Sequence, residues 1–166
     1  RDYKVTGVQT CALPISEQRP LVYLATMRPE GKEAEKRISR HRKQREGKGF
    51  QTVERLVNLS GVSLPENSVV LLECLGNLAA NELFDPEGGG PQAKEKILQG
   101  IKNLCDCGRI VIAVSNEAFS DGVSYGEEIR NYLKLLTSVN RTLSLWADQV
   151  TEVVAGIPLF WKGENV

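Results

Sequence analysis

The 166-residue sequence has no excess of either charge, because 21 Lys and Arg residues balance 21 Asp and Glu residues. A uniform positive field that would attract nucleic acid or an anionic membrane is therefore excluded. Cysteine is scarce as well, and the pair Cys105 and Cys107 has neither a second pair nor a nearby histidine, so it makes a poor zinc site. These absences predict a cytoplasmic protein with reduced thiols and no nucleic-acid partner.

Long apolar runs are also missing, so no membrane span is expected. The first residues lack the charged start, apolar centre and cleavage site of a signal peptide. The stretch VTGVQTCALPIS, residues 5–16, instead resembles the translation of a common sequencing-library adapter. We expect residues 1–16 to be a non-native leader, and residues 17–166 to be an N-terminally truncated nucleotide-binding domain.

The motif G-x-x-x-x-G-K-[ST], whose backbone cradles phosphates, does not occur in the sequence. In P-loop proteins this motif follows the first strand, close to the N-terminus. Here the expected leader occupies that position. We therefore expect the first strand and the P-loop to be missing upstream of Glu17.

What the sequence does contain is an alternation of compact apolar runs with helical patterns. Strands are predicted at about 21–26, 50–54, 69–73, 109–115 and 150–154, and helices at about 32–46, 76–84, 92–105 and 127–147. Strands that alternate with helices form βαβ units. The sequence thus predicts an α/β fold with a mostly parallel sheet and helices on both faces.

Ligands of such sheets bind outside the C-terminal ends of the strands. The polar residues expected there are Thr26, Glu73, Ser115, Asn116 and Glu117. Glu73 closes the apolar run VVLLE, where a carboxylate is costly unless it is paired or binds a metal. It could hold Mg²⁺, as acids at strand ends do in nucleoside triphosphatases, or it could lie in water. Glu117 has the same two interpretations, and Asn116 could be a turn residue.

His41 is the single histidine, and it lies four residues from both Arg37 and Arg45 on the predicted helix. Nearby cations disfavour the imidazolium, and a neutral imidazole nitrogen is a nucleophile. The same cations would attract a polyphosphate. A solvated basic helix with an incidental histidine is the alternative.

Seven stretches, taken in order, resemble the bifunctional adenosylcobinamide kinase and adenosylcobinamide-phosphate guanylyltransferase family of cobalamin biosynthesis: VYLATM, RISRHRKQR, TVE, LLECLGNLAANELF, VSNE, VNRTL and ADQVTEVVAGIP. The resemblance covers Leu21 to about Pro158. It implies a RecA-like P-loop NTPase fold, built as a three-layer sandwich, and a homotrimer. It also implies two reactions. The first phosphorylates adenosylcobinamide with ATP or GTP, and the second transfers GMP from GTP to adenosylcobinamide phosphate through a guanylyl-histidine.

The family's functional residues match positions of this sequence one by one. His41 matches the histidine of the covalent intermediate, and Glu73 is also the expected ligand of Mg²⁺. The nucleotide contacts match Ala25, Thr26, Met27, Arg42, Lys43, Gln44, Arg45, Glu54 and Glu73. One residue more than in the family pattern separates His41 from Glu54. Without a P-loop, the chain is expected to bind GTP poorly and to be impaired most in the kinase step.

Two other hypotheses stay open on the residues alone. A non-catalytic nucleotide-binding subunit of the same fold would need no nucleophile. A P-loop kinase of another small molecule would keep Glu73 but would have no use for His41.

Overall fold

The computed structural model describes residues 19–106, 109–116 and 125–163. The described chain divides into two units, residues 19–140 and 141–163. Within these residues, no helix is both long and apolar enough to cross a membrane.

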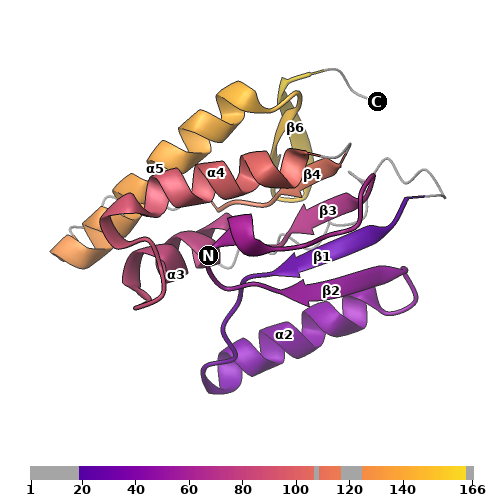
Figure 1. Ribbon diagram of the computed structural model, residues 1–166, viewed down its shortest axis with the longest axis horizontal. Coiled ribbons are helices and arrows are strands. Elements are labelled where there is room, and N and C mark those ends of the chain that lie inside the picture. The colour runs from indigo at the N-terminus through magenta and orange to yellow at the C-terminus, as the bar shows by residue number, and fades with distance from the viewer. Residues whose placement is uncertain (1–18, 107–108, 117–124, 164–166) are drawn as a thin grey trace. The chain divides into compact units, whose positions relative to one another are not determined.

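The first unit is built on a parallel sheet of four strands in the order β2-β1-β3-β4 (Figure 1). The strands are β1 (Leu21–Ala25), β2 (Phe50–Glu54), β3 (Val69–Leu72) and β4 (Ile110–Ala113). β1 pairs in parallel with both β2 and β3, and β3 pairs in parallel with β4. The predicted α/β class and the first four predicted strands are therefore confirmed.

The helices also lie where the sequence predicts them. They are α2 (Gly31–Arg45), α3 (Leu75–Phe84), α4 (Ala93–Cys105) and α5 (Glu127–Trp146), with short 3-10 turns η1 (Leu59–Gly61) and η2 (Gly90–Gln92). α3 and α4 pack together, and α4 also contacts η1 and β4. The amphipathic pattern of α4 predicts its buried side chains correctly, since Ile97, Ile101 and Leu104 are all in the core.

Both faces of the sheet are covered. Alternate residues of a strand point to opposite faces, so Val22 and Leu24 lie on one face of β1 and Tyr23 on the other. Each of these three residues is at most 1% exposed. All four residues of β3 are buried too, as expected for a parallel strand with layers on both sides.

The predicted strand at 150–154 exists, but the prediction that it joins the parallel sheet is wrong. β5 (Val150–Val154) pairs antiparallel with β6 (Ile157–Lys162), which the sequence analysis missed. Ala155 and Gly156 connect the two strands, and both have positive φ, 50° and 86°. This two-residue turn matches the twist of an antiparallel hairpin, so the chain reverses instead of crossing over.

Candidate active site

Helix α2 carries His41 and lies beside the edge of the sheet formed by β2 and β1 (Figure 1). Glu33 lies in its first turn, and Arg42, Lys43 and Arg45 lie in its last turn. These charges complement the helix dipole at both ends. The helix ends before Gly47, whose φ of 73° favours glycine.

His41 and Arg45 are one helical turn apart, so they lie on the same side of α2. Both contact Tyr23, in the middle of β1. This side of the helix, which we call the inner face, therefore packs against the sheet.

The imidazole of His41 forms a hydrogen bond with Glu73, at the C-terminal end of β3. Nδ1 of His41 lies 2.7 Å from Oε1 of Glu73, and the two side chains are 18% and 5% exposed. An ionised carboxylate only accepts, so Nδ1 carries the proton and donates it. The lone pair of the neutral ring is then on Nε2. The His41–Glu73 pair thus presents a nitrogen nucleophile with a fixed tautomer.

The sequence places only cations around His41, and the structure differs from that expectation. The carboxylate of Glu73 contacts the ring directly, while Arg45 points to Tyr23 and Arg42 to Glu54. Arg42 and Arg45 thus contact other side chains, and an acid from another element contacts the histidine.

Tyr23 is the site residue that the sequence analysis missed. Its hydroxyl oxygen lies 3.3 Å from Nδ1 of His41. The guanidinium of Arg45 lies over its ring at 3.5 Å from the centroid, and Phe50 meets the ring edge-on. A tyrosine within the apolar stretch LVYLA was the available signal, because a buried phenol requires a polar partner.

Arg45 has one donor that remains free for a ligand. Its Nη2 donates to Oγ1 of Thr52 at 3.3 Å. Its Nη1 is buried and has no partner among the described residues. A buried donor without a partner is costly, so an anionic group would be stabilised at this position.

Arg42 and Glu54 form an exposed ion pair at the side of α2. Nη2 of Arg42 donates to Oε1 of Glu54 at 3.1 Å, and the side chains are 64% and 68% exposed. Such a pair contributes at most about 1 kcal/mol to stability. Both side chains can therefore rearrange to bind a ligand at little cost.

The residues that follow β1 meet the end of β3, as the sequence predicts for a parallel sheet. Thr26 is fully buried, and its hydroxyl donates to the carbonyl of Cys74 at 3.0 Å. The neighbouring Ala25 and Met27 are half-buried. Asn81 of α3 donates to the carbonyl of Thr26 at 2.9 Å, which ties this corner to the helix.

Cys74 follows Glu73 and is the nearest alternative nucleophile. Burial raises the pKa of its thiol above the ordinary value. Its sulfur accepts a hydrogen bond from the backbone N–H of Asn77, at the start of α3. A thiol that keeps its proton is a weak nucleophile, so His41 is the stronger candidate.

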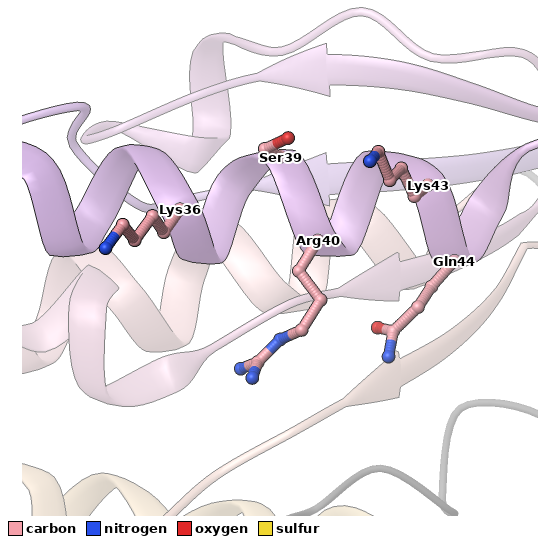
Figure 2. Close-up of a pocket in the computed structure, with 5 residues that line it drawn as sticks. All are labelled: Lys36, Ser39, Arg40, Lys43 and Gln44. Carbon is pink, nitrogen blue, oxygen red and sulfur yellow. The ribbon is translucent and has the colours of Figure 1, made fainter.

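Lys43 and Gln44, two of the predicted nucleotide contacts, lie away from the inner face. They line an open hollow of about 480 Å³ together with Lys36, Ser39 and Arg40 (Figure 2). Because all five belong to α2, this outer hollow is a depression between side chains and not an enclosed cavity. Figure 2 shows Arg40 and Gln44 extending from the helix in the same direction.

A second hollow, of about 470 Å³, lies between the end of α2 and the start of β2. It is lined by Ser39, Arg42, Lys43, Arg45, Glu46, Gly47, Gly49, Phe50 and Thr52. Like the outer hollow it is open and is lined by three cations, but its lining comes from two separate elements and includes Arg45. Its volume falls in the range of ordinary ligand sites.

At the end of β4, Ser115 donates to Oδ1 of Asn140 at 2.7 Å. The thiol of Cys74 lies 3.9 Å from Oδ1 of Asn116. Glu117, which was predicted at the same sheet edge, lies outside the described residues.

Comparison with known proteins identifies the family of the chain. Residues 8–160 match the family described as "Cobinamide kinase / cobinamide phosphate guanyltransferase". The chain is also 31% identical over 157 residues to the "Bifunctional adenosylcobalamin biosynthesis protein CobU" of Escherichia coli (strain K12), a match that covers 86% of each chain. The chain therefore belongs to the CobU family, the kinases and guanylyltransferases of cobalamin biosynthesis.

Proposed function

We propose that this protein transfers GMP from GTP to adenosylcobinamide phosphate, with His41 as the covalent carrier. Membership of the CobU family supports the reaction class. The observation that carries the proposal is the contact of 2.7 Å between Nδ1 of His41 and Oε1 of Glu73. It supports the neutral tautomer with the proton on Nδ1, in which Nε2 has the lone pair that a nucleophile needs.

In the first step, Nε2 of His41 attacks the α-phosphorus of GTP. The P–N bond forms while the bond from phosphorus to the bridging oxygen breaks, and pyrophosphate leaves with that electron pair. The imidazole gains positive charge as it donates its lone pair. The Glu73 carboxylate on Nδ1 stabilises this charge without itself becoming protonated.

In the second step, a phosphate oxygen of adenosylcobinamide phosphate attacks the same phosphorus. The P–N bond breaks, Nε2 recovers its lone pair, and adenosylcobinamide-GDP is released. Because a phosphoramidate is labile, the covalent intermediate divides one difficult transfer into two easier ones.

The cations near the end of α2 are the proposed contacts of the triphosphate. Arg45 offers its unpartnered Nη1, and Arg42 and Lys43 line the same second hollow. Glu54 would contact the nucleotide after separation from Arg42. Gln44 and the backbone at residues 25–27 complete the proposed set, and their assignment depends on the family alone.

The described residues could supply only some of the ligands of a Mg²⁺ ion. Among the described residues there is no group of three or more His, Cys, Asp or Glu side chains that could hold a metal ion. Mg²⁺ is commonly bound by one or two carboxylates together with substrate phosphates and water. Oε2 of Glu73 meets this requirement, because His41 occupies only Oε1. When bound, the ion would neutralise charge on the leaving pyrophosphate.

The kinase step, with ATP or GTP as phosphoryl donor and adenosylcobinamide as acceptor, is proposed from family membership alone. The sequence itself holds no P-loop motif. Assembly as a homotrimer and a cytoplasmic location likewise stay predictions.

The test of the proposal is covalent labelling with GTP that carries radioactive phosphorus at the α position. The chain should acquire a label that is labile in acid and stable in base, and GTP labelled at the γ position should leave none. His41→Ala should not be labelled. A non-catalytic nucleotide-binding subunit, or a kinase of another small molecule, would show no such label in any variant.

A further inference from the structure

Tyr23 contacts two residues of the proposed active site, His41 and Arg45, and the family resemblance assigns it no role. Its hydroxyl lies 3.3 Å from Nδ1 of His41, and its ring lies under the guanidinium of Arg45 at 3.5 Å. It is on the same face of the sheet as Glu73, because Tyr23 is opposite Leu71 in the register and Glu73 lies two residues further.

Burial and charge keep the Tyr23 hydroxyl protonated. Burial raises the pKa of Tyr23 well above its ordinary value, and the negative charge of Glu73 raises it further. Arg45 opposes this effect and is outweighed. The hydroxyl is therefore a hydrogen-bond donor throughout the neutral range.

Among the described residues, the Glu73 carboxylate is an acceptor that this donor and His41 can share. Nδ1 of His41 has a single proton and donates it to Oε1 of Glu73. A protonated Nδ1 cannot accept from Tyr23, so the hydroxyl, 3.3 Å from Nδ1 and on the same face of the sheet as Glu73, is expected to donate to the Glu73 carboxylate. Two donors then fix the carboxylate from two elements, β1 and α2.

We propose that Tyr23 is a positioning residue, whose hydroxyl orients the Glu73 carboxylate so that His41 keeps its proton on Nδ1 and its lone pair on Nε2. The Tyr23 ring also supports the guanidinium of Arg45, whose Nη1 is a proposed contact of the nucleotide. The expected effect on labelling kinetics rests on the proposed function. The expected tautomer of His41 rests only on the contacts among Tyr23, His41 and Glu73.

A purely structural role for Tyr23 is the competing explanation, since a 1% exposed aromatic side chain also fills the core. Tyr23→Phe separates the two, because it keeps the ring, the stacking with Arg45 and the packing on Phe50, and removes only the hydroxyl. Tyr132→Phe is the matched control. Burial also raises the pKa of Tyr132, and it has no hydrogen bond to His41 or Glu73 among the described residues.

The chain offers a direct readout, because His41 is its single histidine. Protein purified without a histidine tag and grown on ¹⁵N-labelled histidine gives the imidazole signals of His41 alone. At mildly alkaline pH, the parent and Tyr132→Phe should show a protonated Nδ1 and an unprotonated Nε2. Tyr23→Phe should show a mixture of the two tautomers. Identical spectra for the parent and Tyr23→Phe would overturn the inference.

Labelling kinetics provide the second readout. Tyr23→Phe should lower the maximal rate of His41 labelling about tenfold, the effect typical of losing a residue that orients an active group, and leave the KM for GTP within about twofold. Tyr23→Leu should also raise that KM, because Arg45 loses its support. A parental labelling rate in Tyr23→Phe would contradict the inference. If the parent is never labelled, the proposed function fails, whereas the tautomer spectra still decide the role of Tyr23.

Discussion

The two sides of helix α2 have similar composition and opposite surroundings. On the inner face, His41 and Arg45 contact Tyr23 and Glu73, side chains of a buried sheet. On the outer side, Lys36, Arg40 and Lys43 are exposed around an open hollow and take part in none of the ion pairs found among the described residues. A basic helix thus gains catalytic potential only where the sheet places an acid and a phenol opposite it.

The largest expected effect comes from removing the imidazole of His41, the proposed nucleophile on the inner face of α2. His41→Ala should lower GMP transfer by several orders of magnitude, because no other group forms the covalent intermediate. Whatever rate of adenosylcobinamide phosphorylation the parent shows should change little in the variant, since the kinase step uses the γ-phosphate. Separate assays of the two steps measure this, and His41→Asn should behave in the same way because it keeps polarity without the nucleophile. GMP transfer near the parental rate in either variant would make His41 an ordinary surface residue.

Removing the acid opposite His41 should have the next largest effect. Glu73→Gln keeps the shape of the side chain but loses the charge that stabilises the developing imidazolium. We expect the rate of His41 labelling to fall about 100-fold, at the upper end for a residue that orients and supports an active histidine. The rate at saturating GTP measures the loss. A fall of less than about threefold would show that Glu73 does not act on the histidine.

Replacing one arginine on each side of α2, Arg45 and Arg40, compares the inner face with the outer side directly. Arg45→Ala removes the cation over Tyr23 and the bond to Thr52, and should lower the free energy of unfolding by about 1–2 kcal/mol. It should also raise the KM for GTP. Arg40→Ala, on the outer side, should change stability by no more than about 0.5 kcal/mol. Denaturant unfolding and labelling at varied GTP concentration test both variants, and equal effects would remove the distinction between the sides.

The smallest effects should come from the lysines of the outer hollow. Lys43→Ala should raise the KM for GTP about threefold at low salt, since one exposed charge contributes up to about 1 kcal/mol and salt screens it. Lys36→Ala should leave the KM unchanged. If Lys36→Ala raises the KM as much as Lys43→Ala, the nucleotide contacts are not confined to the positions that the family resemblance assigns.

Much of the sheet could be predicted because its signals are local. The apolar runs at β1, β3 and β4 and the helical pattern of α2 and α4 are each complete within a short stretch of chain. The position of Glu73 at a strand end is local too. Its interaction with His41 is not, because the two residues are 32 apart in the sequence and meet only through the register of β1 with β3.

Tyr23 and the hairpin show two further limits of the sequence. Tyr23 lies 18 residues from His41, and an apolar strand with one tyrosine does not show which residue its hydroxyl contacts. The end of β5 was ambiguous, because the turn contains Ala155 as well as Gly156, and an alanine rarely has positive φ. The apolar run after the turn, which contains Phe160 and Trp161, was the available signal for β6.

The atom to which GMP becomes attached tests the central claim most directly. Attachment at Nε2 of His41 agrees with the proposed tautomer, and attachment at Nδ1 does not. The protein, produced with ¹⁵N-labelled histidine and then reacted with GTP, should show an NMR coupling between phosphorus and one imidazole nitrogen of His41, its single histidine. The His41–Glu73 contact predicts that this nitrogen is Nε2 and that Nδ1 keeps its proton. Phosphorus on Nδ1, or a covalent GMP on any other residue, would contradict the account.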